Sequence, residues 1–351
     1  MATAPSDDQG RSGASRYDVL DAIRGLGILA VVVDHFSTSC NRWLHTFHLP
    51  VFFVVGGLLY EGARGDFRTF VARKVRSLLV PYYAVGAALL AYWWLLERHF
   101  RTADGGLPWY LALLGLITGS DGTGGWLRFG GTIWFLPTYF ALVVLFDALS
   151  RLAQGRWRLP GVLLLVLAGG ALAPRVVLPF GLVQALGALG WFWLGHQLRA
   201  TPFLSIATGR GTAGGLLAAT AALALSVATV DSVNLSTQNL GTSVFSLYGE
   251  SLPGVLLLVA LGGLLASAIP LRILGESSLY VMCFHPQIGR VVTKVASVVS
   301  GIPMDDLRRG GASLLLSLAI AALTTVLVRA VQRGSTTLLE RRAARRRKQE
   351  A

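Results

Sequence analysis

Long apolar stretches separated by short polar segments run along almost the whole chain. An apolar stretch of about 18 or more residues predicts a transmembrane helix, because roughly 20 residues at about 1.5 Å rise per residue cross the hydrocarbon core. Backbone groups in lipid must be satisfied within each segment, so we expect an all-α, polytopic integral membrane bundle. The pattern predicts about ten transmembrane helices, centred on Leu20–Phe36, Pro50–Gly62, Leu78–Leu96, Ile133–Leu149, Gly161–Ala173, Phe180–Leu198, Ala213–Val230, Leu252–Ile269, Ser277–Val299 and Ala312–Val331.

A further apolar segment, Trp109–Thr118, is too short to span and is expected to be re-entrant or interfacial. If it did span, the two termini would lie on opposite sides of the membrane. Without it, the Lys and Arg residues gather mainly on the side of both termini, which predicts that both termini are cytoplasmic. We divide the chain into a disordered cytoplasmic N-terminus (1–15), a membrane domain (16–333) and a basic cytoplasmic tail (334–351).

Composition narrows the class of protein further. Hydrophobic residues make up 53% of the 351 residues and charged residues only 14%, against roughly 25% charged in a soluble domain. This excludes a disordered chain and argues against a soluble enzyme. Two cysteines cannot hold together a chain of this length, which excludes a disulfide scaffold. The formal net charge of +13 indicates contact with anionic membrane lipid and no nucleic-acid partner.

Ionisable residues are concentrated in the first predicted span, where each is costly and therefore a functional candidate. Arg24 and His35 are eleven residues apart, which is about three helical turns, so they share a face about 16 Å apart along the axis. Asp21 lies three residues before Arg24 and can pair with it. The alternatives are that Arg24 only reaches the cytoplasmic surface, and that Asp34 and His35 only cap the outer helix end.

Several motifs follow one another in a distinctive order. Arg24 and His35 enclose ten residues, and Arg73 and Arg76 enclose two. The others are Phe47-His48-Leu49-Pro50-Val51-Phe52-Phe53, Thr132-Ile133-Trp134-Phe135-Leu136-Pro137, and Leu274-Gly275-Glu276-Ser277-Ser278-Leu279-Tyr280 with His285. Over roughly residues 16–331 the chain resembles the acyltransferase 3 family of integral membrane acyltransferases, and within it the fucose 4-O-acetylase-like branch. Where family members often have Ser-Gly, this chain has Gly56-Gly57, so no serine role is assigned there.

The resemblance implies transfer of an acyl group, acetyl by default, from cytoplasmic acyl-CoA to a hydroxyl of a sugar, glycan or glycosylated metabolite. It also implies a bacterial inner (cytoplasmic) membrane. Removal of the hydroxyl proton needs a base, and His35 is the natural candidate. Arg24, positioned by Asp21, lies where it could contact the pantetheine arm or the diphosphate. Two catalytic routes stay open, namely direct attack in a ternary complex and a covalent acyl-His35 intermediate.

CoA is polyanionic, and a cationic segment follows the second predicted span. Arginine binds phosphate in bidentate fashion, so Arg73 and Arg76, three apart on a helix, are expected to contact CoA together with Lys74. The alternative for these residues is a topology anchor in a cytoplasmic loop.

Four further residues are candidates for substrate contact. His48 could help to bind the acceptor, or could simply begin a helix. Trp134 is expected to be an interfacial aromatic residue, with stacking on a sugar ring as the second interpretation. Glu276 and His285 match the late family motif, although the sequence shows no partner for either.

The sequence predicts no metal site, because it contains no Cys/His pair at ligand spacing and no His-Glu-x-x-His. The competing functional hypothesis is a transporter or flippase of a polar or lipid-linked sugar, which would also place polar residues inside spans. That hypothesis predicts inverted repeats with broken helices in corresponding places, and none is evident in the sequence. A membrane scaffold would not need the ionisable residues of the first span.

Overall fold

The structure is a computed structural model that describes residues 15–39, 41–99, 106–120, 125–153, 155–203, 214–218, 220–221, 233–241 and 243–350. The secondary structure of these residues consists of helices joined by turns and loops, with one isolated bridge between Asn234 and Asn239. The predicted all-α fold class is therefore confirmed for the described part of the chain. Most of the predicted span Ala213–Val230 lies outside the described residues.

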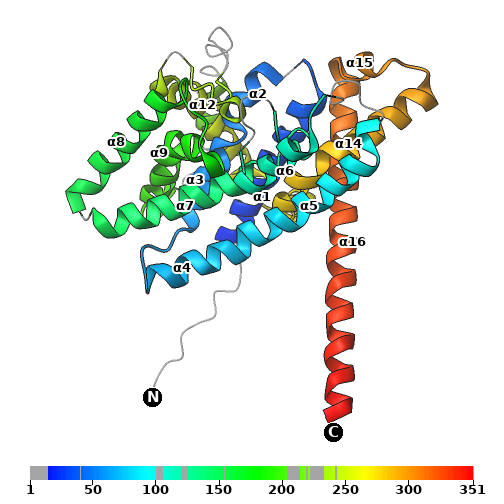
Figure 1. The fold of residues 1–351 in the computed structure, drawn as a ribbon. Helices are drawn as coiled ribbons and strands as arrows, with labels where there is room; N and C mark the ends of the chain where they lie inside the picture. The colour runs from blue at the N-terminus through cyan, green and yellow to red at the C-terminus, as the bar shows by residue number, and fades with distance from the viewer. Residues whose placement is uncertain are drawn as a thin grey trace, which may run out of the picture.

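Helix α1 (Arg16–Phe36) runs through the centre of the bundle (Figure 1). It begins at a capping box in which Ser15 accepts a hydrogen bond from the Asp18 amide and donates its own amide to the Asp18 carboxylate. It packs against the C-terminal helices and the two short helices that follow it. Those helices are α2 (Asn41–Phe47), α3 (Pro50–Leu59), α12 (Val244–Leu264), α13 (Ile269–Glu276), α14 (Ser278–Ser300) and α16 (Gly310–Glu350).

Reciprocal glycines allow two helix pairs to approach closely. A Cβ atom on Gly25 of α1 would overlap the carbonyl of Leu271 in α13, and one on Gly275 of α13 would overlap the carbonyl of Asp21. Small residues at such positions let helix backbones meet in the absence of a hydrophobic driving force in lipid. The pair α3 and α9 (Leu182–Leu198) is joined in the same way, through Gly57 and Gly195.

The remaining described helices form the other half of the bundle. Helix α4 (Phe67–Lys74) continues through a π-helical turn (Val75–Leu79) into α5 (Val80–Leu95). The segment predicted to be re-entrant is α6 (Trp109–Thr118), a ten-residue helix joined to α5 by hydrogen bonds from Tyr82 and Tyr83. Helices α7 (Phe135–Leu152) and α8 (Arg158–Leu172) complete this half, and α15 (Met304–Leu307) precedes α16.

Five helical stretches of the described chain are long and apolar enough to cross a membrane, and each overlaps a predicted span. The other predicted spans take different forms. Helix α3 has 10 residues and α9 has 17, while α1 and α14 carry several ionisable residues. The count of about ten and the side of the termini remain predictions. The five stretches are Phe67–His99, Phe135–Leu152, Gly155–Leu172, Val244–Leu264 and Gly310–Gly334.

Helix α16 is 41 residues long and continues through the predicted basic tail as far as Glu350. It runs out of the bundle on the side where α1 begins (Figure 1). Helix α12 begins at Val244, earlier than the predicted Leu252, because Ser243 provides a capping box there.

Candidate active site

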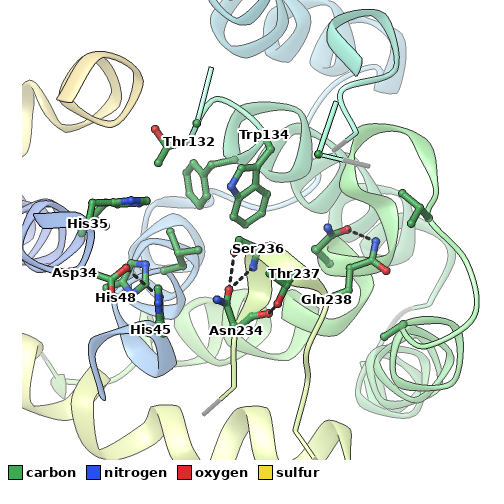
Figure 2. Close-up of a pocket in the computed structure, with 18 of the residues that line it drawn as sticks. Asp34, His35, His45, His48, Thr132, Trp134, Asn234, Ser236, Thr237 and Gln238 are labelled. Carbon is green, nitrogen blue, oxygen red and sulfur yellow. Dashed lines mark hydrogen bonds and ion pairs between the residues drawn. The ribbon is translucent and has the colours of Figure 1, made fainter. Parts of the chain in front are cut away.

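A cavity of about 670 Å³ lies at the C-terminal end of α1. We call it the large cavity. Its wall is formed by segments that are far apart in sequence (Figure 2). From the N-terminal region come Asp34, His35, His45 and His48, and from the rest of the chain come Arg128, Thr132, Trp134, Phe135, Arg175, Gln184, Asn234, Ser236, Thr237, Gln238 and Met282.

The N-terminal wall of the large cavity depends on a tight reversal of the chain. Helix α1 ends at Phe36, where the Ser37 amide donates to the Val33 carbonyl at 2.7 Å. The chain then turns and enters α2, so that the last turn of α1 faces the end of α2. His45 and His48 are three residues apart and share one side, which brings both close to Asp34 (Figure 2).

His35 lines the large cavity and is in contact with a second histidine. The ring of His285 in α14 lies 5.1 Å from the His35 ring, centroid to centroid, at an interplanar angle of 59°. His285 is fully buried, and its Nδ1 lies 2.8 Å from the Val281 carbonyl. Donation of the Nδ1 proton to that carbonyl leaves Nε2 as an acceptor, and Nε2 has no hydrogen-bond partner among the described residues. No partner for His285 is evident in the sequence, and the structure places the His35 ring beside it.

Aromatic and polar residues of the segment before α7 form the facing wall. Trp134 and Phe135 line the cavity, and Trp134 projects into it from the side opposite His35 (Figure 2). The Thr132 hydroxyl donates to the Met282 carbonyl, which joins this segment to α14. Trp134 therefore lies in the wall of the large cavity, and its stacking on a sugar ring stays a prediction.

The rest of the polar wall was not predicted from the sequence. Arg128, Arg175 and Gln184 contribute to it, and the remainder comes from a short turn. In this turn the Asn234 side chain accepts hydrogen bonds from the Ser236 amide at 3.0 Å and the Ser236 hydroxyl at 2.6 Å. Thr237 and Gln238 follow in the same turn and also line the cavity (Figure 2). The only sequence signal for this wall was that the segment is polar and lacks Lys and Arg, which many loops share.

A second, smaller cavity of about 230 Å³ lies farther toward the N-terminal half of α1, and we call it the small cavity. Arg24 lines it, together with apolar residues of α3, α7 and α14. Phe135 and Met282 line both cavities, so the two spaces adjoin at these side chains. Arg24 and His35 therefore each line one of two adjoining cavities.

The two charged residues in the wall of the small cavity are both paired. Arg24 donates to Asp21 at 3.0 Å, the ion pair expected from their spacing. Glu276 lines the small cavity and forms an ion pair with Arg329 of α16, which also hydrogen-bonds to Ser277. The sequence showed no partner for Glu276, because the two residues are 53 positions apart.

The cationic segment lies outside the walls of both cavities. Arg73 and Arg76 are exposed, and Lys74 lies over the Phe70 ring at 5.5 Å. Because the chain is π-helical from Val75 to Leu79, the three-residue spacing no longer fixes a shared face for the two arginines. Leu78, within the same π-helical turn, lines the small cavity, so this segment reaches the cavity through its apolar side.

One comparison with known proteins matches nearly the whole length of the chain. Neither the curated proteins nor the solved structures contain a match to this chain. Residues 17–330 match the sequence model of a family described as an acyltransferase domain, Acyl_transf_3. Because the match covers nearly the whole chain, including both cavities, the protein belongs to the acyltransferase 3 family.

Proposed function

We propose that the protein transfers an acyl group, acetyl by default, from cytoplasmic acyl-CoA to a hydroxyl of a sugar, glycan or glycosylated metabolite, with His35 as general base. Membership of the family supports a membrane acyltransferase. One observation carries the finer proposal. The cavity that contains His35 and the cavity that contains Arg24 adjoin at Phe135 and Met282, so a donor and an acceptor can meet from two sides.

The small cavity suits the donor. Its apolar residues match a narrow pantetheine arm, and Arg24 offers a positive charge to the arm's polar groups or the diphosphate. Arg73, Lys74 and Arg76 lie in the segment that leads to Leu78 in the wall of this cavity, and they would bind the phosphates outside it. The thioester would then lie near the junction of the two cavities.

The large cavity suits a carbohydrate acceptor. Hydroxyl-rich ligands are recognised by a few well-placed polar groups and by aromatic faces. Trp134 supplies the aromatic face, and Asn234, Gln184 and Gln238 supply amide donors and acceptors. His48 lies in the same wall and would contact the acceptor. The proposal includes an acceptor specificity like that of the fucose 4-O-acetylase-like branch.

The reaction follows from these positions. A free His35 nitrogen accepts the proton of the acceptor hydroxyl while the hydroxyl oxygen attacks the thioester carbonyl carbon. The resulting tetrahedral intermediate collapses, the C–S bond breaks, and the imidazolium returns the proton to the CoA thiolate. In this scheme His285 accepts a hydrogen bond from the other His35 nitrogen and so keeps the reactive nitrogen unprotonated and oriented.

The test is CoA release from acetyl-CoA by the purified full-length protein in detergent or liposomes, with and without a pool of sugar acceptors. Wild type should release CoA with acceptor, His35→Ala should not, and the pair Arg73→Ala/Arg76→Ala should show a raised KM for acetyl-CoA. His99→Ala, an exposed histidine away from both cavities, is the matched control and should behave as wild type. Turnover by His35→Ala at the wild-type rate would reject the assignment of the base.

The same assay separates the two catalytic routes and the transporter alternative. A covalent route predicts an acetylated His35 that accumulates without acceptor, and ping-pong kinetics. A transporter predicts no acetyl-CoA turnover, and uptake or flipping of a labelled sugar by proteoliposomes.

A further inference from the structure

Three side chains in the wall of the large cavity, of which Asp34 and His48 are buried and His45 is partly exposed, form a cluster of a different kind. Asp34 of α1 and His45 and His48 at the end of α2 each offer one ligand atom, and these atoms lie within 4.8 Å of one another. We propose that Asp34, His45 and His48 bind a divalent transition-metal ion, with Zn²⁺ as the expected ion. The sequence analysis predicted no metal, because these ligands are contributed by two helices across a turn and match no spacing motif.

The first argument is the state of the Asp34 carboxylate. Its side chain is only 1% exposed, and neither oxygen accepts a hydrogen bond from a described residue. His45 Nδ1 is 2.9 Å from Asp34 Oδ2, yet the contact does not have the geometry of a hydrogen bond. A buried carboxylate is costly unless a hydrogen bond or a cation compensates for its lost hydration. Two atoms that bind the same metal ion lie at about this distance of 2.9 Å, and no hydrogen bond forms between them.

The second argument is the tautomer of His48. Its Nδ1 lies 2.5 Å from the Leu44 carbonyl, so the Nδ1 proton is donated to the backbone and Nε2 keeps its lone pair. This is the usual arrangement of a metal-binding histidine, whose other nitrogen donates to a carbonyl or carboxylate. The rings of His45 and His48 are 5.8 Å apart, so both can face one point between them.

The distances within the cluster and its position in the cavity wall also suit a metal ion. Zn²⁺ binds nitrogen at about 2.0–2.1 Å and carboxylate oxygen at about 2.0–2.2 Å, so two ligand atoms of one ion are at most about 4.3 Å apart. The cluster therefore needs a movement of well under 1 Å to close on an ion. Two imidazoles and one carboxylate leave at least one position open, and all three residues line the large cavity.

The cluster lines the cavity in which the acceptor would lie, so the open position of a bound ion would be accessible from that space. An ion there would bind water or a hydroxyl oxygen of the acceptor, and this last point rests on the proposed function. The site itself does not, because it follows from the contacts of Asp34, His45 and His48 alone. His35 lies outside the ligand group, so the base and the ion can be removed separately.

The experiment measures the metal content of the full-length protein, purified through a tag without histidine, after Zn²⁺ loading and dialysis. We expect about one Zn²⁺ per chain in wild type, in His99→Gln and in His35→Ala. Asp34→Asn and His45→Gln should bind Zn²⁺ at least about 100-fold more weakly, because each removes a ligand. Gel filtration and thermal unfolding of the variants show whether they remain folded.

Loading with Co²⁺ provides a second readout that does not depend on the variants, since its visible spectrum reports nitrogen and oxygen coordination. A wild-type Zn²⁺ content equal to that of folded Asp34→Asn, or a Co²⁺ spectrum identical to that of the aqueous ion, would overturn the proposal. His35→Ala separates the two hypotheses, since it should keep the metal and lose transfer. Wild type that binds Zn²⁺ but turns over no acyl-CoA would reject the proposed function and leave the metal site standing.

Discussion

His285 provides the sharpest test of how His35 would act. Its ring lies 5.1 Å from the His35 ring, but it lines neither cavity. A residue that touches neither substrate and acts through the base should affect kcat and leave KM nearly unchanged. We therefore expect His285→Ala to lower kcat for acyl transfer, with the KM values for acyl-CoA and for the acceptor close to those of wild type.

The expected size of the effect follows from the one hydrogen bond that the proposed scheme places between His35 and His285. His285 is fully buried, its Nδ1 is held by the Val281 carbonyl, and its Nε2 is left as an acceptor for His35. A hydrogen bond to a group that becomes charged contributes about 1.5–3 kcal/mol. Each 1.36 kcal/mol corresponds to a tenfold change in rate, so kcat should fall by about 10- to 150-fold.

The assay is steady-state CoA release by wild type, His285→Ala, His285→Gln, His35→Ala and the double variant. Glutamine offers a carbonyl oxygen as acceptor and should restore part of the rate lost in His285→Ala. The double variant should be no slower than His35→Ala, because the two residues act as one unit. An equal loss from His285→Ala in the presence and absence of His35, or a raised KM at unchanged kcat, would refute the positioning role.

Three further substitutions test the architecture around the site. Met282→Trp should fill the junction of the two cavities and abolish transfer while acyl-CoA still binds. Met304→Trp on the exposed α15 should leave both turnover and donor binding unchanged. Gly275→Ala should lower the free energy of unfolding by about 1–3 kcal/mol or more, because its Cβ would overlap a backbone carbonyl of α1, while Gly249→Ala should not, as followed by thermal unfolding. Asp147→Asn should lower the melting temperature of the detergent-solubilised protein, because Asp147 is buried, accepts a tyrosine hydroxyl at 2.7 Å and pairs with an arginine at 2.6 Å; an unchanged melting temperature would refute this role.

The part of the site on α1 could be predicted from the sequence because its signals are local. An eleven-residue separation places two side chains on one helix face whatever the rest of the fold is. Arg24 and His35 accordingly line the two adjoining cavities, and Asp21 pairs with Arg24 as its three-residue spacing implied. His48 and Trp134 came from family motifs, and both lie in the wall of the large cavity.

The remaining wall could not be predicted because it is assembled by packing between distant segments. Asn234 and Gln238 belong to an ordinary polar turn, and only the fold brings that turn opposite His35. The pair Glu276–Arg329 depends on the contact between α13 and α16, which no spacing in the sequence encodes. The same holds for His35 and His285, whose rings meet because α1 packs on α14.

Hydropathy predicts more spans than the five long apolar helices of the described residues, and helix-breaking residues are one physical reason. A window of apolar residues counts Gly and Pro as neutral, yet both end or shorten helices. Helix α3 begins at Pro50 and ends at Leu59, and Gly62 follows with a φ of 92°. The free backbone N–H and C=O groups at the ends of such a short helix must be covered by other parts of the protein. Helix α9 packs along α3.

The transporter and acyltransferase hypotheses differ in the size of the group that must pass the junction at Phe135 and Met282. A transporter must pass its whole cargo through any constriction in its path, and a sugar would have to move between these two side chains. An acyltransferase needs only the acyl end of a narrow arm to reach the base, while the CoA phosphates and the acceptor stay on their own sides. The cavities differ in this way, since the small one is mainly apolar with Arg24 and Glu276 in its wall, while the large one is rich in amides, hydroxyls and imidazoles and also contains Arg128 and Arg175. This asymmetry favours transfer across the junction over passage through it.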